Sequence, residues 1–141
     1  MIILDTNVIS ELMNPRCDAA LQKWIDSIDP SDIRSTAITS YEIAFGIMRL
    51  PDGKRKDALL RSWQIVADQY LRGRVLPLDQ SAALTAGEAR KMALSVGNNC
   101  DICDVLIAGI AAHHNARVAT RNVRHFDGLP IDLIDPWSAT V

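Results

Sequence analysis

Residues 2–10 read Ile-Ile-Leu-Asp-Thr-Asn-Val-Ile-Ser, and in this stretch a short apolar run is followed directly by an acid. The run Ile2 to Leu4 is typical of a strand that is buried on both faces of a parallel sheet. Such a strand needs no carboxylate at its end for stability. Parallel α/β sheets carry their functional groups at the carboxyl ends of the strands, so Asp5 predicts a site at this edge.

Four further β-rich runs recur along the chain, separated by longer segments with helical periodicity. We expect the five strands at residues 2–4, 33–38, 75–78, 117–120 and 131–134. Apolar residues spaced three or four apart predict helices between them, as in Leu21, Trp24 and Ile25. The alternation predicts an α/β fold with a central, mainly parallel sheet of four to five strands covered by helices. No long linker or repeat interrupts residues 1–141, which predicts a single domain.

Composition narrows the possible functions. The net charge of −2 argues against a surface that binds polyanions everywhere, so any contact with nucleic acid should be local. The three cysteines cannot all pair within one chain, and the first residues lack a signal-peptide pattern. We therefore expect a cytoplasmic protein. Apolar runs are short and broken by charge, which predicts no membrane-spanning segment.

Two further acids fall where predicted strands give way to helices. Glu42 follows the second strand, and Asp104 opens a late helix. Each has a structural explanation, because residues 39–42 read as a capping box and Asp101 and Asp104 lie where a helix N-terminus is electropositive. Together with Asp5, however, these acids would converge at one edge of a parallel sheet. Like charges repel strongly in such a cleft, and a divalent cation would relieve the repulsion.

The fourth strand is followed by a second group of polar residues. Thr120, Arg121 and Asn122 offer a hydroxyl, a guanidinium and an amide oxygen. Carboxylate and amide oxygens without His-rich spacing favour Mg²⁺ or Mn²⁺ over zinc. Arg121 also lies in a short basic segment with Arg117, Arg124 and His125, which could hold phosphates or could be a solvated turn.

These motifs, taken in order, carry a family resemblance. Leu4-Asp5-Thr6-Asn7, Glu42, Asp104-Val105-Leu106-Ile107-Ala108 and Thr120-Arg121-Asn122 resemble the PIN-domain ribonucleases, particularly the VapC and FitB-like toxins of prokaryotic toxin-antitoxin pairs. The resemblance covers nearly the whole chain. It implies a PIN-like α/β/α sandwich, cleavage of RNA with Mg²⁺ or Mn²⁺, and inhibition by a small antitoxin of the VapB or FitA type.

The resemblance also implies roles for individual residues. Asp5, Glu42 and Asp104 would be the catalytic acids, with Asp5 and Asp104 anchoring the metal. Thr6, Asn7 and Thr120 would orient carboxylates or water by hydrogen bonding. Asn122 stands where the family often has an acid, so it offers an oxygen without a charge. From its place in the basic segment, we expect Arg121 to contact the RNA.

Several other interpretations remain open. A catalytically silent PIN-like module would use the acidic pocket to receive a basic peptide. Cys100 and Cys103 at a helix start are compatible with redox chemistry or, with His113 and His114, with zinc. The absence of any lysine after Lys91 disfavours a phosphotransfer receiver.

The sequence gives weaker indications of the oligomeric state and of the substrate than of the fold. The stripe Leu59, Trp63, Val66 and Tyr70 could form part of a homodimer or antitoxin groove, or could face the core. We expect a homodimer. No residue of the sequence identifies which RNA is cleaved or at which bases.

Overall fold

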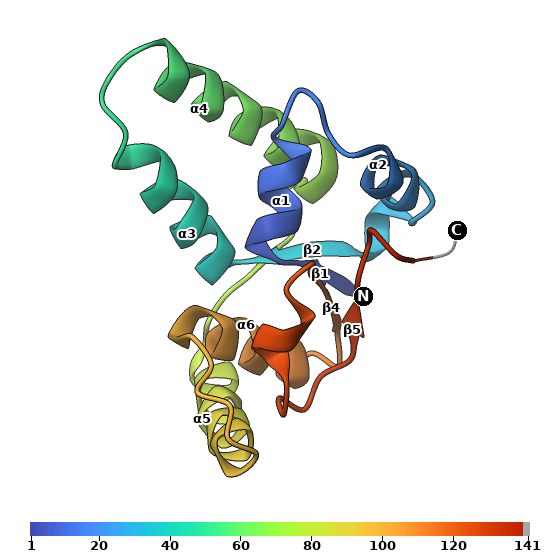
Figure 1. Ribbon diagram of the computed structural model, residues 1–141, viewed down its shortest axis with the longest axis vertical. Coiled ribbons are helices and arrows are strands. Elements are labelled where there is room, and N and C mark those ends of the chain that lie inside the picture. The colour runs from blue at the N-terminus through green and yellow to red at the C-terminus, as the bar shows by residue number, and fades with distance from the viewer. Residues whose placement is uncertain (140–141) are drawn as a thin grey trace.

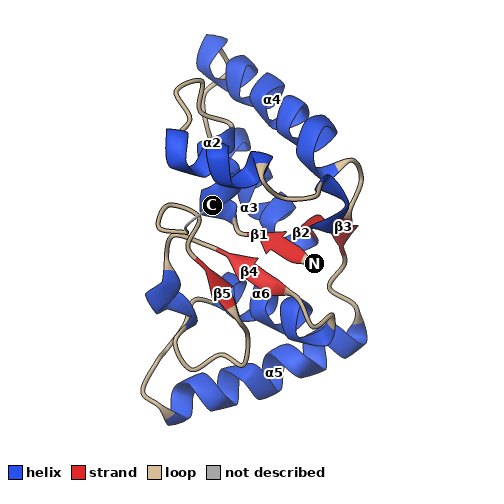
Figure 2. Ribbon diagram, turned by 90° about the vertical axis from the view of Figure 1, so that its right-hand side faces the viewer, coloured by secondary structure: helices blue, strands red, loops and turns tan. Residues whose placement is uncertain are grey.

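Five short parallel strands form one sheet in the order β3-β2-β1-β4-β5. The computed structural model describes residues 1–139. The strands are β1 (Ile2–Leu4), β2 (Ile33–Thr36), β3 (Val75–Leu76), β4 (Arg117–Ala119) and β5 (Leu133–Ile134). Figure 2 shows the strands side by side at the centre of the molecule. The predicted α/β class and five-stranded parallel sheet are therefore confirmed.

Within the described residues, six α-helices cover the two faces of this sheet. They are α1 (Thr6–Leu12), α2 (Ala19–Asp26), α3 (Ala37–Met48), α4 (Lys54–Val66), α5 (Gln80–Ser95) and α6 (Ile102–His113). Short 3-10 helices span Pro30–Asp32 and Val123–Phe126, and a π-helical turn spans Ala67–Leu71. In Figure 1, α1 to α4 lie on one side of the sheet and α5 and α6 lie on the other. The arrangement is the α/β/α sandwich that the resemblance implies.

The central strand shows why this sheet is covered on both faces. Successive side chains of a strand point to opposite faces. Ile2 and Leu4 join the core beneath α1 to α4, whereas Ile3 joins the core beneath α5 and α6. All three side chains are buried. The fully covered central strand β1 therefore ends directly before Asp5.

Helices α5 and α6 approach each other unusually closely because the residues between them are small. Ala82, Ala86, Ala89 and Ala93 are all buried along one side of α5. Gly109 of α6 lies against Ala86, and any Cβ added at Gly109 would overlap the backbone and side chain of that alanine. The close contact fixes the position of α6, which carries Asp104 in its first turn.

The start of α3 differs from the prediction. The second strand ends at Thr36 rather than Ile38, and the Thr36 side chain caps α3 by accepting a hydrogen bond from Thr39 N at 3.0 Å. The predicted capping box over residues 39–42 is therefore wrong. Glu42 lies in the second turn of α3 rather than the first. Because Thr36 does the capping, the Glu42 carboxylate is available for other contacts.

Three other predicted strands are shorter in the structure. The strand β3 ends at Leu76 because Pro77 has no N–H to continue the ladder. The strand β4 ends at Ala119, and β5 begins only at Leu133. The five predicted strands are otherwise in place.

The apolar stripe on α4 and the π-helical turn packs mainly inward. Val66 is buried, and Leu59, Trp63 and Tyr70 are partly buried against the core beneath α1 to α4. The core interpretation of this stripe is confirmed. None of the helices within residues 1–139 combines the length and apolar character needed to cross a membrane.

Candidate active site

A cavity of about 440 Å³ lies at the carboxyl ends of the central strands. All three predicted catalytic acids, Asp5, Glu42 and Asp104, line it. The remaining lining residues are Thr6, Asn7, Ser10, Asp101, Asn122 and His125. We call it the acidic cavity. Segments far apart in the sequence, such as those that carry Asp5 and His125, are thus brought to one place, as the parallel sheet predicts.

Asp5 is the most buried of the acids and the most firmly held. Its side chain caps α1, and Oδ1 accepts a hydrogen bond from Thr6 N at 2.7 Å. Oδ2 accepts from Asn7 Nδ2 at 2.6 Å and from Thr120 Oγ1 at 2.8 Å. With only 4% of the residue exposed, Asp5 has one fixed orientation.

Thr120 links the two strands that carry the site. Its Oγ1 donates to Asp5 and accepts from Asn7 Nδ2 and from Asn122 N, each at 3.0 Å. The hydroxyl therefore uses its one donor and both of its acceptor positions. Asn7 and Thr120 hold the Asp5 carboxylate, which is the geometry that an orienting role requires.

Glu42 and Asp104 reach the cavity from two helices. Glu42 Oε1 accepts a hydrogen bond from Thr6 Oγ1 at 2.6 Å, which ties α3 to α1. Asp104 lies in the first turn of α6, where Asp101 caps the helix through Cys103 N at 2.9 Å. The predicted capping role of Asp101 is confirmed.

The electrostatics of the acidic cavity favour a cation. Burial raises the pKa of Asp5 and of Glu42 above their ordinary values. Burial, followed by the neighbouring Asp5 charge, raises the pKa of Asp104 to about 6. Neither lysine nor arginine lines the cavity. Among the described residues, His125 is therefore the one basic side chain beside these acids, and a cation would further reduce the repulsion between them.

The donors present fit a hard divalent cation. Apart from the His125 imidazole, they are carboxylate, amide and hydroxyl oxygens, the ligands that Mg²⁺ and Mn²⁺ prefer. Within residues 1–139, no three His, Cys, Asp or Glu side chains are grouped as a complete metal site. Mg²⁺ is usually held by one or two carboxylates and several waters, a mode that does not require three protein acids. Asp5 and Asp104 are the residues that fit this role.

Three residues of the cavity, Ser10, Asp101 and His125, are not among the predicted site residues. Ser10 lies one helical turn after Thr6 on α1, and this spacing of four could have identified it. His125 was noted only as part of a basic segment. Its Nδ1 lies 3.3 Å from Asp104 Oδ2. No local sequence signal links two residues that come together only through tertiary packing.

Arg121 is placed differently from the other predicted residues. Its backbone N–H donates to Asn7 Oδ1 at 3.0 Å, but its side chain does not line the acidic cavity. The guanidinium carbon lies 5.1 Å from the centroid of the Trp137 ring. Arg121 is therefore at the border of the site rather than within it.

The cysteine-based interpretations lack support from the geometry. Burial, together with the Glu42 and Asp101 charges, raises the pKa of Cys103 to about 11, and burial also raises the pKa of Cys100. Both thiols are thus protonated at neutral pH and poorly nucleophilic. His113 and His114 lie at the other end of α6 from the two cysteines, about 15 Å along the helix. The four residues do not form a zinc site.

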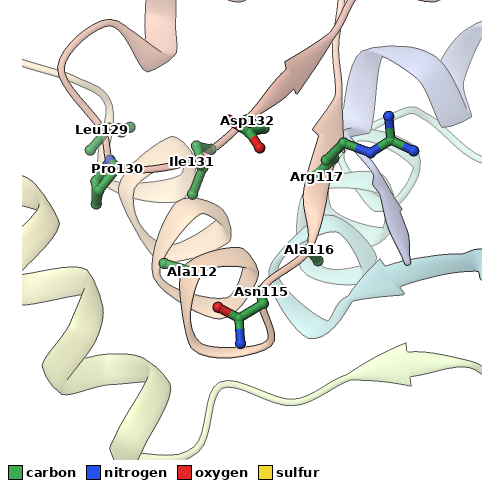
Figure 3. Close-up of a pocket in the computed structure, with 8 residues that line it drawn as sticks. All are labelled: Ala112, Asn115, Ala116, Arg117, Leu129, Pro130, Ile131 and Asp132. Atoms are coloured by element: carbon green, nitrogen blue, oxygen red, sulfur yellow. The ribbon is translucent and has the colours of Figure 1, made fainter.

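A second cavity, of about 470 Å³, lies at the amino ends of β4 and β5. It is lined by Ala112, Asn115, Ala116, Arg117, Leu129, Pro130, Ile131 and Asp132. Figure 3 shows these side chains and the Arg117 guanidinium directed away from Leu129 and Pro130. We call it the amino-end cavity. It holds one acid and no cluster of chemical groups.

Comparison with known proteins identifies the family of this chain. The PIN-domain family model matches residues 2–130. The chain is 36% identical to VapC ribonuclease Y4jK of Sinorhizobium fredii, covering 97% of this chain and 98% of that protein. It is 34% identical to toxin FitB of Neisseria gonorrhoeae, covering 97% of this chain and 99% of that protein.

A solved structure extends the similarity to the fold. The structure of FitAB bound to the IR36 DNA fragment superposes with a TM-score of 0.89 at 33% identity, covering 100% of this chain and 99% of that chain. The family model, the sequence relatives and the superposition all extend over nearly the whole chain, including the segments that carry Asp5, Glu42, Asp104 and Thr120. This chain belongs to the PIN-domain family and is similar in sequence to its VapC and FitB toxins.

Proposed function

We propose that the protein is a metal-dependent endoribonuclease and the toxin of a toxin-antitoxin pair. The observation that carries the proposal is the convergence of Asp5, Glu42 and Asp104 on one cavity of about 440 Å³ that lacks any basic lining residue other than His125. Membership of the PIN-domain family and similarity to a protein named VapC ribonuclease support the same conclusion.

The proposed chemistry assigns a role to each residue of the cavity. Asp5 and Asp104 hold Mg²⁺ or Mn²⁺, which when bound supplies positive charge for an in-line displacement at a phosphodiester. Asn7 and Thr120 fix the orientation of Asp5 through its Oδ2 atom. Glu42 orients the attacking water, while Thr6 holds its carboxylate through Oε1. Asn122 contributes a neutral oxygen at the cavity wall.

An adjoining cavity supports the antitoxin part of the proposal. It has a volume of about 190 Å³ and shares Thr6, Ser10 and Glu42 with the acidic cavity. Its other lining residues are mostly apolar, namely Met13, Ile43, Gly46, Ile47 and Leu59. A peptide with an apolar side chain followed by an arginine would fit both cavities. A guanidinium on the carboxylates would displace the metal and so inhibit the enzyme. We assign this position to an antitoxin of the VapB or FitA type.

A homodimer is supported by an exposed apolar surface on α3. Tyr41, Phe45 and Met48 are 60%, 57% and 56% exposed, and the rings of Tyr41 and Phe45 stack with centroids 6.2 Å apart. Tyr41 directly precedes Glu42 in α3, so this surface lies beside the helix face that carries Glu42. We propose that a second copy of the chain covers it. Light scattering on the purified toxin alone tests this, and a Phe45→Glu variant should be monomeric.

The activity is tested by incubating wild type and Asp5→Asn with total RNA. Each reaction contains Mg²⁺, Mn²⁺ or a chelator, and the new RNA ends are then mapped. We expect discrete ends with wild type and metal, and none with chelator or with Asp5→Asn. The same ends in contaminant-free Asp5→Asn would contradict the assignment. No cleavage by wild type with any metal would favour a silent module that binds a basic peptide.

A further inference from the structure

Arg121 is tied to the acidic cavity through its backbone while its charge lies beside that cavity. Its N–H donates to Asn7 Oδ1 at 3.0 Å, and Asn7 donates in turn to Asp5 Oδ2 at 2.6 Å. The guanidinium carbon lies 5.1 Å from the centroid of the Trp137 ring. Two hydrogen bonds therefore connect the Arg121 backbone to a catalytic carboxylate, and an aromatic ring sets where its side chain goes.

Trp137 is a fixed support for this guanidinium. The backbone N–H of Trp137 donates to Asp135 Oδ1 at 3.0 Å, and the backbone N–H of Ala139 donates to Asp135 O at 3.0 Å. These two hydrogen bonds close a turn after β5. The Trp137 ring is partly buried against the core beneath α1 to α4. A cation held over an aromatic ring is stabilised by the ring electrons and loses rotational freedom. The ring therefore preorganises Arg121.

The guanidinium N–H donors of Arg121 have no carboxylate partner among the described residues. Within residues 1–139, no carboxylate lies within ion-pair distance of its guanidinium, and the residue is exposed. An arginine that stacks through its face keeps its N–H donors free, and this planar fork matches the oxygens of a phosphate. The structure thus holds a positioned, unpaired guanidinium at the border of the acidic cavity.

An RNA strand needs such a group at this border. With one phosphodiester at the acids, the next phosphate passes out of the cavity and is repelled by the same carboxylates. The α3 side of the cavity continues into the apolar cavity lined by Ile43 and Leu59, which offers a phosphate no partner. We propose that Arg121 binds the RNA phosphate next to the one that is cleaved, with Trp137 as its positioning residue. This inference rests on the proposed function and adds a substrate subsite to it.

The first experiment measures how binding of single-stranded RNA depends on salt. Binding is measured by fluorescence anisotropy in an Asp5→Asn background, with and without Arg121→Ala. Loss of one phosphate contact should weaken binding roughly 10-fold at low salt. It should also make the log–log salt slope shallower by about 0.7. Arg117→Ala is the matched control, because it removes the same charge at the other end of β4, and it should leave the slope unchanged.

The second experiment locates the phosphate. Oligonucleotides with one neutral methylphosphonate linkage are placed at each position around the cleaved bond. In otherwise wild-type protein, neutralising the adjacent linkage should raise KM about 10-fold with little change in kcat. In Arg121→Ala, the same linkage should have almost no further effect. Equal losses in both proteins would overturn the proposal.

Variants of Trp137 separate positioning from structure. Trp137→Leu should raise KM for RNA in the same direction as Arg121→Ala, whereas Trp137→Phe should restore most of the affinity because it keeps an aromatic face. Thermal unfolding of both variants checks that the fold is retained. An equal KM in the leucine and phenylalanine variants would show that the ring does not position Arg121.

The outcomes distinguish this inference from the proposed function. If wild type cleaves RNA but the salt slope of Arg121→Ala is unchanged, the subsite is wrong and the nuclease stands. If no metal supports cleavage but the slope becomes shallower, the nuclease is wrong and the RNA contact stands.

Discussion

Two cavities of nearly equal volume, about 440 and 470 Å³, lie at opposite ends of the same sheet. The acidic cavity at the carboxyl ends gathers Asp5, Glu42 and Asp104 around the N-termini of α1 and α6. The amino-end cavity is slightly larger, yet it holds only Asp132 among acids.

The difference shows that strand direction, rather than cavity size, locates the chemistry. At the carboxyl ends, helix N-termini present backbone N–H groups that hold carboxylates, as Thr6 N holds Asp5. At the amino ends, the chain arrives from helix C-termini, whose exposed groups are carbonyls. Backbone N–H groups are therefore available to donate a hydrogen bond to a carboxylate at the carboxyl ends of the strands.

The largest expected effect comes from neutralising one acid in each cavity. Asp5→Asn should reduce metal-dependent RNA cleavage by about 100-fold or more, because it removes a proposed metal ligand. Asp132→Asn should leave the rate unchanged within about 2-fold, since no proposed role falls on that residue. Cleavage rates under single-turnover conditions provide the measurement. Similar losses in both variants would remove the distinction between the two cavities.

The next effect concerns Asp104 and pH. Its pKa rises from 3.8 to about 6 on folding, so folding favours the protonated acid. The resulting stability is present below pH 3.8 and is lost as pH rises through about 6. At pH 7 without metal, Asp104→Asn should therefore be more stable than wild type, by at most about 3 kcal/mol. Urea unfolding at several pH values measures the difference.

Bound metal should reverse the order of stability of wild type and Asp104→Asn. Saturating Mg²⁺ should raise the Tm of wild type at pH 7 and have little effect on Asp104→Asn, because binding stabilises only the folded state that holds the ligands. Metal affinity should also weaken below about pH 6, where protons compete for the carboxylate. If the Tm of wild type did not change on addition of Mg²⁺, this would argue against the metal site.

A smaller loss should follow from Thr120→Val. The buried Thr120 hydroxyl donates to Asp5 and accepts from Asn7 and Asn122, so valine leaves those partners unsatisfied. We expect a destabilisation of about 1 to 3 kcal/mol together with reduced cleavage. Thr120→Ser keeps the hydroxyl and should recover most of the cleavage rate. Failure of serine to do better than valine would contradict the orienting role.

The smallest effect should come from Ser35, a buried hydroxyl that lines neither cavity. Among the buried side chains of residues 1–139, its Oγ is the atom without a hydrogen-bond partner. Ser35→Ala should therefore raise the free energy of unfolding, by about 1 kcal/mol or less, and leave cleavage unchanged. A clear loss of stability in chemical denaturation would show that this hydroxyl has a partner in solution.

Much of the fold could be predicted because its signals are local. The apolar runs locate the strands, and Ala82, Ala86, Ala89 and Ala93, spaced three or four residues apart, are buried along one side of α5. The start of α3 could not be placed from the sequence, since Thr36 and Thr39 are both good caps and the structure uses Thr36. That shift of one turn is what directs Glu42 to Thr6 Oγ1.

The amino-acid sequence was sufficient to identify the acids Asp5, Glu42 and Asp104, the likeness to PIN-domain proteins and the parallel sheet. Tertiary structure alone determined that Arg121 lies over Trp137 and that His125 contacts Asp104. The physical reason is one of range. A buried strand and the acid that follows it are recognised within a few consecutive residues. The direction of an exposed side chain, in contrast, depends on partners that packing brings from distant segments.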